Sequence, residues 1–122
     1  MARIAGRFLV AIGLLHVVLF PWWGRVPLLA AAQDGFFNAV NPHKDRQEIF
    51  WSLCFGMMGV FLGQLISWSD AQGKQTPAFL GWELLGLAAL GAVLMPISGW
   101  WLVMVPAVLI LAASRRGPVA TY

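Results

Sequence analysis

The sequence predicts an all-α protein, a four-transmembrane-helix bundle with a short interfacial segment between helices 1 and 2. Of its 122 residues, 60% are hydrophobic and only 11% are charged. The mean hydropathy of +0.76 lies outside the range of water-soluble domains. The apolar residues fall into four runs with tryptophans near their ends. A single membrane domain over residues 1–122 is therefore expected.

The first two spans are expected at residues 4–23 and 49–68. About twenty residues at ~1.5 Å per residue supply the ~30 Å that a hydrocarbon core requires. Between these spans, residues 26–40 are too short and too polar to cross the bilayer but suit its interface. Asn41 and Pro42 predict the start of the second helix, because asparagine caps free amides and proline fits the first helical position.

The third and fourth spans are expected at residues 78–95 and 100–113. The loop before the third span is rich in helix breakers, and another breaker-rich turn separates it from the fourth. Within the fourth span, Pro106 has no N–H to donate to the carbonyl of Leu102. That carbonyl needs a donor from elsewhere in the bundle.

Charge and tryptophan positions predict a multi-pass protein of the cell (inner) membrane with both termini in the cytoplasm. Most basic residues then lie inside, namely Arg3, Arg7, Lys74, Arg115 and Arg116, and fewer lie outside, namely Arg25, Lys44 and Arg46. The tryptophans form two belts, an outer one of Trp22, Trp23, Trp51, Trp100 and Trp101 and an inner one of Trp68 and Trp82.

The same composition limits which classes of binding partner are expected. Scattered basic residues form no patch, so nucleic acid is not an expected partner. The lipid bilayer is expected, together with a lipophilic small molecule or another membrane subunit. The lone Cys54 lacks the companions of a zinc site. No metal and no cofactor is expected.

Small and polar residues form a stripe along the second span, at steps of four, four, three and four. Its members are Glu48, Ser52, Gly56, Gly59 and Gly63. Because spans in lipid associate through close packing, another helix is expected against this stripe. The helix belongs either to the same chain, in tight internal packing, or to a second copy in a dimer.

Two ionisable residues inside the spans, His16 and Glu83, are the strongest functional pointers, since a charge in lipid costs ~2.5–3.5 kcal/mol. Measured from the outer tryptophans, His16 lies roughly 9 Å deep and Glu83 roughly 20 Å deep, so no contact between them is expected. Arg7 and Gln64 share the depth of Glu83. Glu83 then forms a clamp with Arg7, handles a proton or a ligand, or extends to the interface.

His16 is interpreted either as a structural donor to the freed Leu102 carbonyl or as an acid/base or ligand contact. Glu48 either interacts favourably with the positive end of its helix dipole or lines the rim of a cavity open to the outside. The candidate catalytic residues are His16, Glu83 and Glu48, and the candidate ligand-binding residues are His16, Glu83, Gln64, Trp51 and Met58. Paired large side chains are interpreted as packing and not as a cofactor box, namely Phe36, Phe37, Met57 and Met58.

Four short motifs resemble a family of small four-helix bacterial membrane proteins of unknown function. They are Gly13–His16, Trp51–Gly56, Pro77–Leu85 and Pro96–Trp100. The resemblance covers most of the chain and implies an integral membrane location without an established reaction.

Gly13 and His16 also resemble a Gly-x-x-His pattern of the sterol-isomerase and sigma-2-receptor superfamily, which encloses a lipophilic cavity. Phe20 stands where the isomerases have a carboxylate, a departure that argues against proton transfer. In size and number of spans the chain is similar to small multidrug exporters, which carry their essential acid in the first span, whereas Glu83 is on the third.

Three functional hypotheses follow. The first is a non-enzymatic membrane protein, either an accessory subunit or a bundle that binds a lipophilic ligand. The second is a membrane-embedded isomerase or cyclase in which His16 or Glu83 moves a proton. The third is a dimeric proton-coupled transporter, for which Glu83 has no cationic partner.

Overall fold

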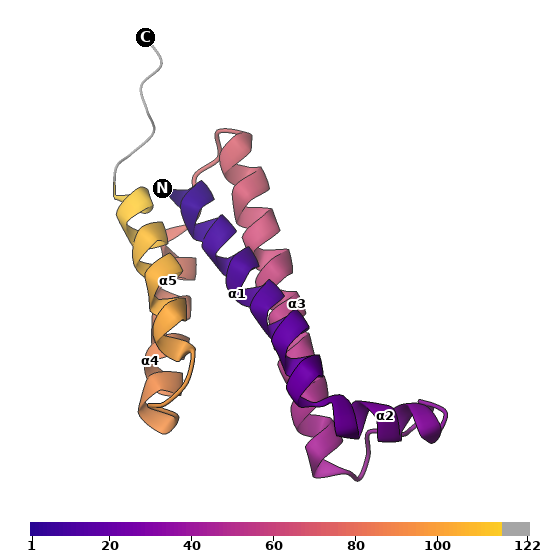
Figure 1. Cartoon of the computed structure of the whole chain (residues 1–122). Helices are drawn as coiled ribbons and strands as arrows, with labels where there is room; N and C mark the ends of the chain where they lie inside the picture. The colour runs from indigo at the N-terminus through magenta and orange to yellow at the C-terminus, as the bar shows by residue number, and fades with distance from the viewer. Residues whose placement is uncertain (116–122) are drawn as a thin grey trace. The chain divides into compact units, whose positions relative to one another are not determined.

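The computed structural model describes residues 1–115, and these form five α-helices without a β-strand (Figure 1). The predicted all-α class is confirmed. The helices are α1 (Ala2–Trp23), α2 (Arg25–Gln33), α3 (Lys44–Ala71), α4 (Ala78–Leu94) and α5 (Trp100–Ser114). Arg116, which was assigned to the cytoplasmic side, lies outside the described residues.

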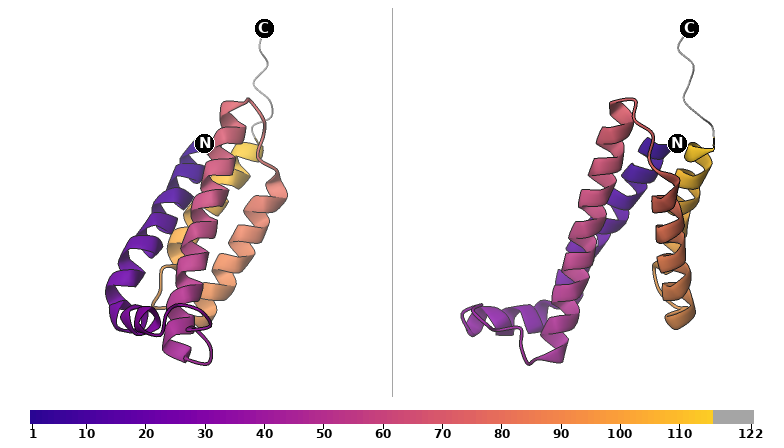
Figure 2. Two further views of the ribbon diagram at one scale, coloured as in Figure 1. Left: turned by 90° about the vertical axis from the view of Figure 1, so that its right-hand side faces the viewer. Right: turned by 180° about the vertical axis from the view of Figure 1, so that it is seen from behind.

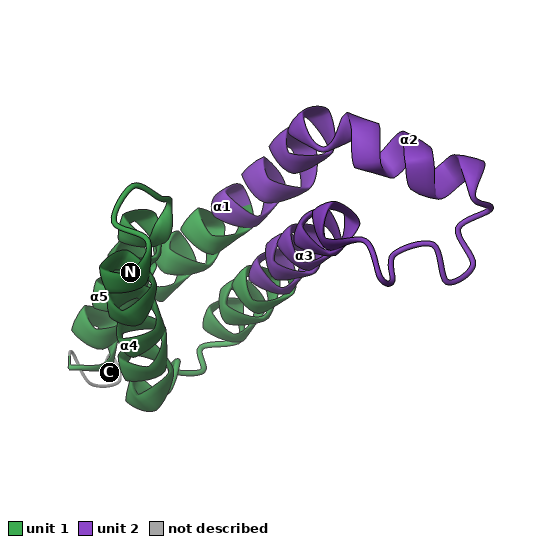
Figure 3. Ribbon diagram, turned by 90° about the horizontal axis from the view of Figure 1, so that it is seen from below, with its two compact units in different colours: residues 1–10, 61–122 green, residues 11–60 purple. Residues whose placement is uncertain are grey.

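The chain divides into two compact units (Figure 3). Unit 1 comprises residues 1–10 and 61–122, and unit 2 comprises residues 11–60. Each unit contains part of α1 and part of α3. Unit 1 adds α4 and α5, and unit 2 adds α2 with the loop that leads into α3.

In unit 1, α4 and α5 lie side by side as an antiparallel hairpin (Figure 2). A Cβ added to Gly81 would meet Leu111 Cγ at 2.7 Å, so this glycine lets the helices approach closely. The core of the unit draws on four helices, α1, α3, α4 and α5. Its buried members are Ala2, Ala5, Leu9, Ile66 and Ile110, with Leu62, Leu80, Leu84, Leu109 and Ala113 packed around them.

Glycines join α1 to α3 in each unit. In unit 1, a Cβ on Gly63 would meet the carbonyl of Gly6 and would lie 2.8 Å from the backbone nitrogen of Val10. In unit 2, a Cβ on Gly56 would lie 2.9 Å from the carbonyl of Gly13. The glycines on each helix are seven residues apart, which repeats one face of a helix. Packing within one chain therefore accounts for Gly56 and Gly63.

The start of α3 differs from the prediction. The helix begins at Lys44, two residues after Pro42, and the peptide bond between Asn41 and Pro42 is cis. Asn41 does not cap the helix, because its side chain accepts a hydrogen bond from Gln47 instead. The cap-and-proline signal did not set the helix start, and Asn41 instead pairs with a side chain six residues further along the chain.

Two helices, α1 and α3, are long and apolar enough to cross a membrane. They have 22 and 28 residues, whereas α4 and α5 are apolar but shorter, with 17 and 15 residues. The first predicted span ends at Trp23, as α1 does. The predicted interfacial segment contains α2, which runs sideways from the end of α1 (Figure 1).

Candidate functional site

Residues 34–43, here called the α2–α3 loop, have an unusual backbone. Three of them adopt positive φ angles, namely Gly35 at 82°, Phe36 at 64° and Asn38 at 51°. Glycine and asparagine tolerate this region, but a bulky residue such as Phe36 pays a steric cost there. Such backbone strain persists only where surrounding contacts hold it, and it is concentrated at functional sites.

Arg46, on the first turn of α3, provides the main contact that holds the loop. Its Nη1 atom lies 2.7 Å from Asp34 Oδ2 and 2.6 Å from the carbonyl oxygen of Ala39. The Arg46 side chain is only 10% exposed, and Ala39 is buried. Charge-assisted hydrogen bonds of this kind are the stronger class. The start and the middle of the loop are therefore tied to the same guanidinium group.

Gln47 makes the second contact. Its Nε2 atom donates to Asn41 Oδ1 over 2.7 Å. This bond leaves the carbonyl oxygen of Gln47 and the amide nitrogen of Asn41 free of any side-chain hydrogen bond to the residues that the structure describes. The loop thus presents a donor on Asn41, and the first turn of α3 presents an acceptor on Gln47.

These contacts frame a pocket of about 390 Å³, here called the loop pocket. Its walls belong to the loop and to the first two turns of α3. They are Phe36, Asn38, Ala39, Val40, Asn41, Gln47, Phe50 and Trp51. Three aromatic rings and three uncharged amides therefore face one space, and no lining residue carries a charge. Apolar walls with a few convergent polar groups are typical of ligand sites.

Of the predicted ligand-binding residues, Trp51 lines the loop pocket. Its indole is 67% exposed and its ring meets Phe50 edge-on, with centroids 5.3 Å apart. Glu48 and Met58 are exposed in the same unit but do not line the pocket. Gln47, the neighbour of Glu48, lines the pocket, and the rim role of Glu48 stays a prediction.

His16 is held by its own helix and by two aromatic rings. Its Nδ1 atom lies 3.0 Å from the carbonyl of Ile12, which accepts a hydrogen bond in the tautomer protonated at Nδ1. Its ring stacks on that of Phe20, with the ring centroids 5.1 Å apart, and is tilted against that of Phe55, with the centroids 5.3 Å apart. The predicted donation to Leu102 stays a prediction, because Leu102 belongs to the other unit.

In unit 1, the predicted clamp between Arg7 and Glu83 is absent from residues 1–115. Both side chains are exposed, and no ion pair in that part of the chain includes either of them. The first turn of α1 instead places Arg3 Nε 3.5 Å from Asp70 Oδ2. Asp70 at the end of α3 was missed as a partner, because it follows the second predicted span, 49–68, and only residues within the spans were compared by depth. Gln64, the third member of the expected layer, is also exposed.

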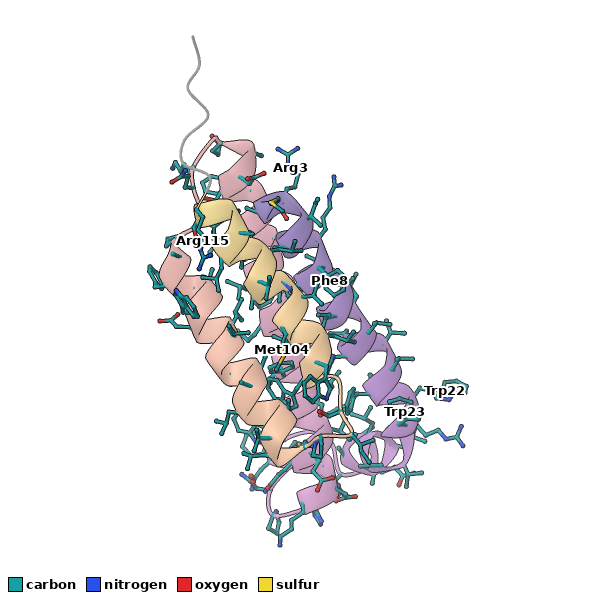
Figure 4. The ribbon with its side chains drawn as sticks, turned by 90° about the vertical axis from the view of Figure 1, so that its left-hand side faces the viewer. Arg3, Phe8, Trp22, Trp23, Met104 and Arg115 are labelled. Atoms are coloured by element: carbon teal, nitrogen blue, oxygen red, sulfur yellow. The ribbon has the colours of Figure 1, made fainter. Side chains whose placement is uncertain are left out.

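A second pocket of about 370 Å³ lies on α5, lined by Val108, Leu111, Ala112 and Arg115. Arg115 is at the end of the helix (Figure 4). Only one lining side chain is polar, so nothing there fixes the orientation of a ligand. Among residues 1–115, no group of three His, Cys, Asp or Glu side chains is arranged to hold a metal ion.

The packing interpretation of the paired aromatic residues was wrong for the loop. Phe36 is 69% exposed and Phe37 is 94% exposed. A usable signal was present in the sequence, because the turn formers Gly35 and Asn38 flank these rings. Turn residues that hold large apolar side chains at the surface indicate a binding loop more than a core.

The family model described as a family of unknown function (DUF6463) matches residues 1–117. This match spans all five helices. No curated protein and no solved structure matches the chain. The protein therefore belongs to the DUF6463 family of unknown function.

Proposed function

We propose that this is an integral membrane protein that binds an amphiphilic molecule in the loop pocket, without catalysing a reaction on it. The observation that carries the proposal is the lining of the loop pocket, where aromatic rings and amides converge. An amphiphile has an apolar part for the rings and a polar part for the amides.

The exposure of the apolar helices supports the membrane part of the proposal. The most apolar windows of α1 and α3 are only 28% and 17% buried, whereas the core helix of a soluble protein is mostly buried. Large apolar side chains are also exposed on α4 and α5, such as Val93, Leu94, Leu102 and Val105. Exposed apolar surface of this extent suits lipid as the solvent.

The proposal includes four spans and cytoplasmic termini. At ~1.5 Å per residue, α4 and α5 are roughly 25 Å and 22 Å long, slightly short of the hydrocarbon core. A bilayer adapts to such short spans by local thinning. In this orientation the loop pocket opens at the outer boundary, beside the exposed Trp22, Trp23 and Trp51.

The environment of His16 favours binding over proton transfer. The ring is stacked on Phe20 and bonded to the carbonyl of Ile12, and neither group can exchange a proton with it. A general base must lie within hydrogen-bond reach of the proton that it removes, and His16 does not line the loop pocket. We therefore rank a binding protein or accessory subunit above an isomerase or cyclase.

A photoaffinity-labelling experiment tests the proposal. The protein in phospholipid nanodiscs is exposed to a photoactivatable alkyl amphiphile, irradiated and digested, and the labelled peptides are identified by mass spectrometry. Saturable labelling is expected in residues 36–51, and Trp51→Ala should abolish it because the aromatic wall is lost.

The matched control is Trp22→Ala. Trp22 is 69% exposed, belongs to the same unit as Trp51 and points away from its helix (Figure 4). It does not line the loop pocket. This variant should keep the labelling at residues 36–51. Labelling that spreads over all exposed apolar faces, or survives in Trp51→Ala, would contradict the proposal.

A further inference from the structure

We infer that the amphiphile bound in the loop pocket has an uncharged headgroup that carries several hydroxyl groups, as a glycosylated lipid does. The inference rests on the proposed function and adds the chemical class of the ligand. Three features of the pocket carry it: the absence of charge, the balance of donors and acceptors, and the exposed rings.

The cation that contacts the pocket lining is already paired with a carboxylate. Arg46 is largely buried, and its Nη1 atom lies within hydrogen-bond distance of both Asp34 and the carbonyl of Ala39. No acidic or basic side chain lines the pocket itself. A phosphate headgroup would meet no cation there, and a choline headgroup would meet no carboxylate. Transfer of an ionic head into this space would lack compensation.

The amides offer donors and acceptors together. Gln47 keeps its carbonyl oxygen and Asn41 keeps its amide nitrogen after their mutual hydrogen bond. Asn38 makes no side-chain hydrogen bond to the residues that the structure describes, so its whole amide faces the pocket or solvent. A hydroxyl group both donates and accepts, whereas a phosphate only accepts and an ammonium only donates. Hydroxyl groups therefore match this set best.

The rings supply the remaining contact. Phe36 and Trp51 are 69% and 67% exposed, and Phe50 is 45% exposed. An exposed aromatic face is apolar but close to polar groups, which suits the C–H face of a sugar ring bordered by hydroxyls. The same rings can also contact the first carbons of an amphiphile's alkyl tail. One pocket can thus hold the head and the start of the tail.

The test compares amphiphiles that share an eight-carbon tail. The full-length protein is labelled with 5-fluorotryptophan and placed in nanodiscs of phosphatidylglycerol and phosphatidylethanolamine, and its ¹⁹F resonances are followed. Trp51→Phe assigns the Trp51 resonance, and Trp22→Phe assigns a control resonance of the same unit. Octyl glucoside, octylphosphocholine and octanoate are titrated separately below their micelle concentrations.

Octyl glucoside should shift the Trp51 resonance saturably and leave that of Trp22 unchanged, at concentrations at least about ten-fold lower than the two charged amphiphiles require. Equal responses to all three would overturn the inference about the headgroup while keeping the binding proposal. No saturable response to any of them would overturn both. Methyl glucoside is titrated as the control without a tail. A saturable response to it but not to octyl glucoside would overturn the amphiphile and assign the hydroxyl chemistry to a free sugar.

Asn38→Asp sharpens the result. The substitution keeps the shape and the tolerance of a positive φ angle but replaces two amide donors by a carboxylate. The loss of one hydrogen bond should weaken octyl glucoside about five-fold. An unchanged affinity would exclude Asn38 as a headgroup contact. Asn38→Gly, which removes the amide without adding charge, should weaken binding to a similar extent.

Discussion

The middle and the start of α3 are held in opposite ways. At Gly56 and Gly63 the helix lies against the backbone of α1, and a single added carbon would collide with it. At Arg46 and Gln47 the helix reaches the α2–α3 loop through long side chains and three hydrogen bonds. The first region depends on glycines, which have no side chain, and the second depends on the long side chains of Arg46 and Gln47.

This difference separates a scaffold from a site. Close backbone packing leaves little freedom and exposes nothing to a ligand. The α2–α3 loop, which Arg46 holds by hydrogen bonds, can instead keep Phe36 and Asn38 at unfavourable positive φ angles. It presents both side chains at the surface. Three substitutions can break or sharpen this comparison.

The largest effect is expected at Gly63. Gly63→Leu should lower the free energy of unfolding by about 3 kcal/mol, because the backbone of α1 cannot move aside for the new side chain. Gly86→Leu on α4 is the control, since a Cβ there meets nothing within 4 Å. Thermal and denaturant unfolding in detergent measure both. Equal losses in the two variants would show that close packing is not specific to the α1–α3 contact.

An intermediate effect is expected at Arg46. Arg46→Met keeps the apolar stem but removes both hydrogen bonds, which should cost about 2 kcal/mol because the buried carbonyl of Ala39 loses its donor. The loop should also become accessible to proteolysis. Lys44→Met, an exposed change two residues away, is the control. A protease-resistant loop in Arg46→Met would mean that other contacts hold it.

The smallest effect on stability is expected at Phe36, with the opposite sign. Phe36→Gly should raise the free energy of unfolding by about 0.5 kcal/mol, because glycine relieves the strain at φ 64° and little buried area is lost. Binding of the amphiphile should weaken at the same time. Phe37→Gly is the control, since Phe37 is 94% exposed and has no positive φ. It should lower stability and leave binding intact.

Prediction from the sequence succeeded where the signal is local. Hydropathy located α1, α3, α4 and α5, and the spacing of small residues by three or four positions marked the face of α3 that meets α1. Trp51, predicted as an interfacial and ligand-binding residue, lines the loop pocket, and its binding role stays a prediction. Each of these signals depends on neighbours within a few turns of one helix, which the sequence displays directly.

Prediction failed where partners are chosen across elements. Depth along the helices paired Arg7 with Glu83, yet the first turn of α1 meets Asp70 through Arg3. The rise per residue along a helix gives the depth of a side chain in the membrane but not the direction in which it points around the helix axis. That direction decides which ion pairs form. Asn41 carried a strong cap signal, but Gln47 competes for the same side chain.

The sequence by itself determined that the chain is helical, strongly apolar and spaced by glycines for close helix contacts. The reason is that composition and periodicity set secondary structure and the preferred solvent before any tertiary contact forms. Only the tertiary structure decided that Arg46 supports the α2–α3 loop and that rings and amides from two elements meet in one pocket. Those contacts depend on where the chain turns back on itself, and long polar side chains can satisfy their hydrogen bonds in many alternative ways until the fold selects one.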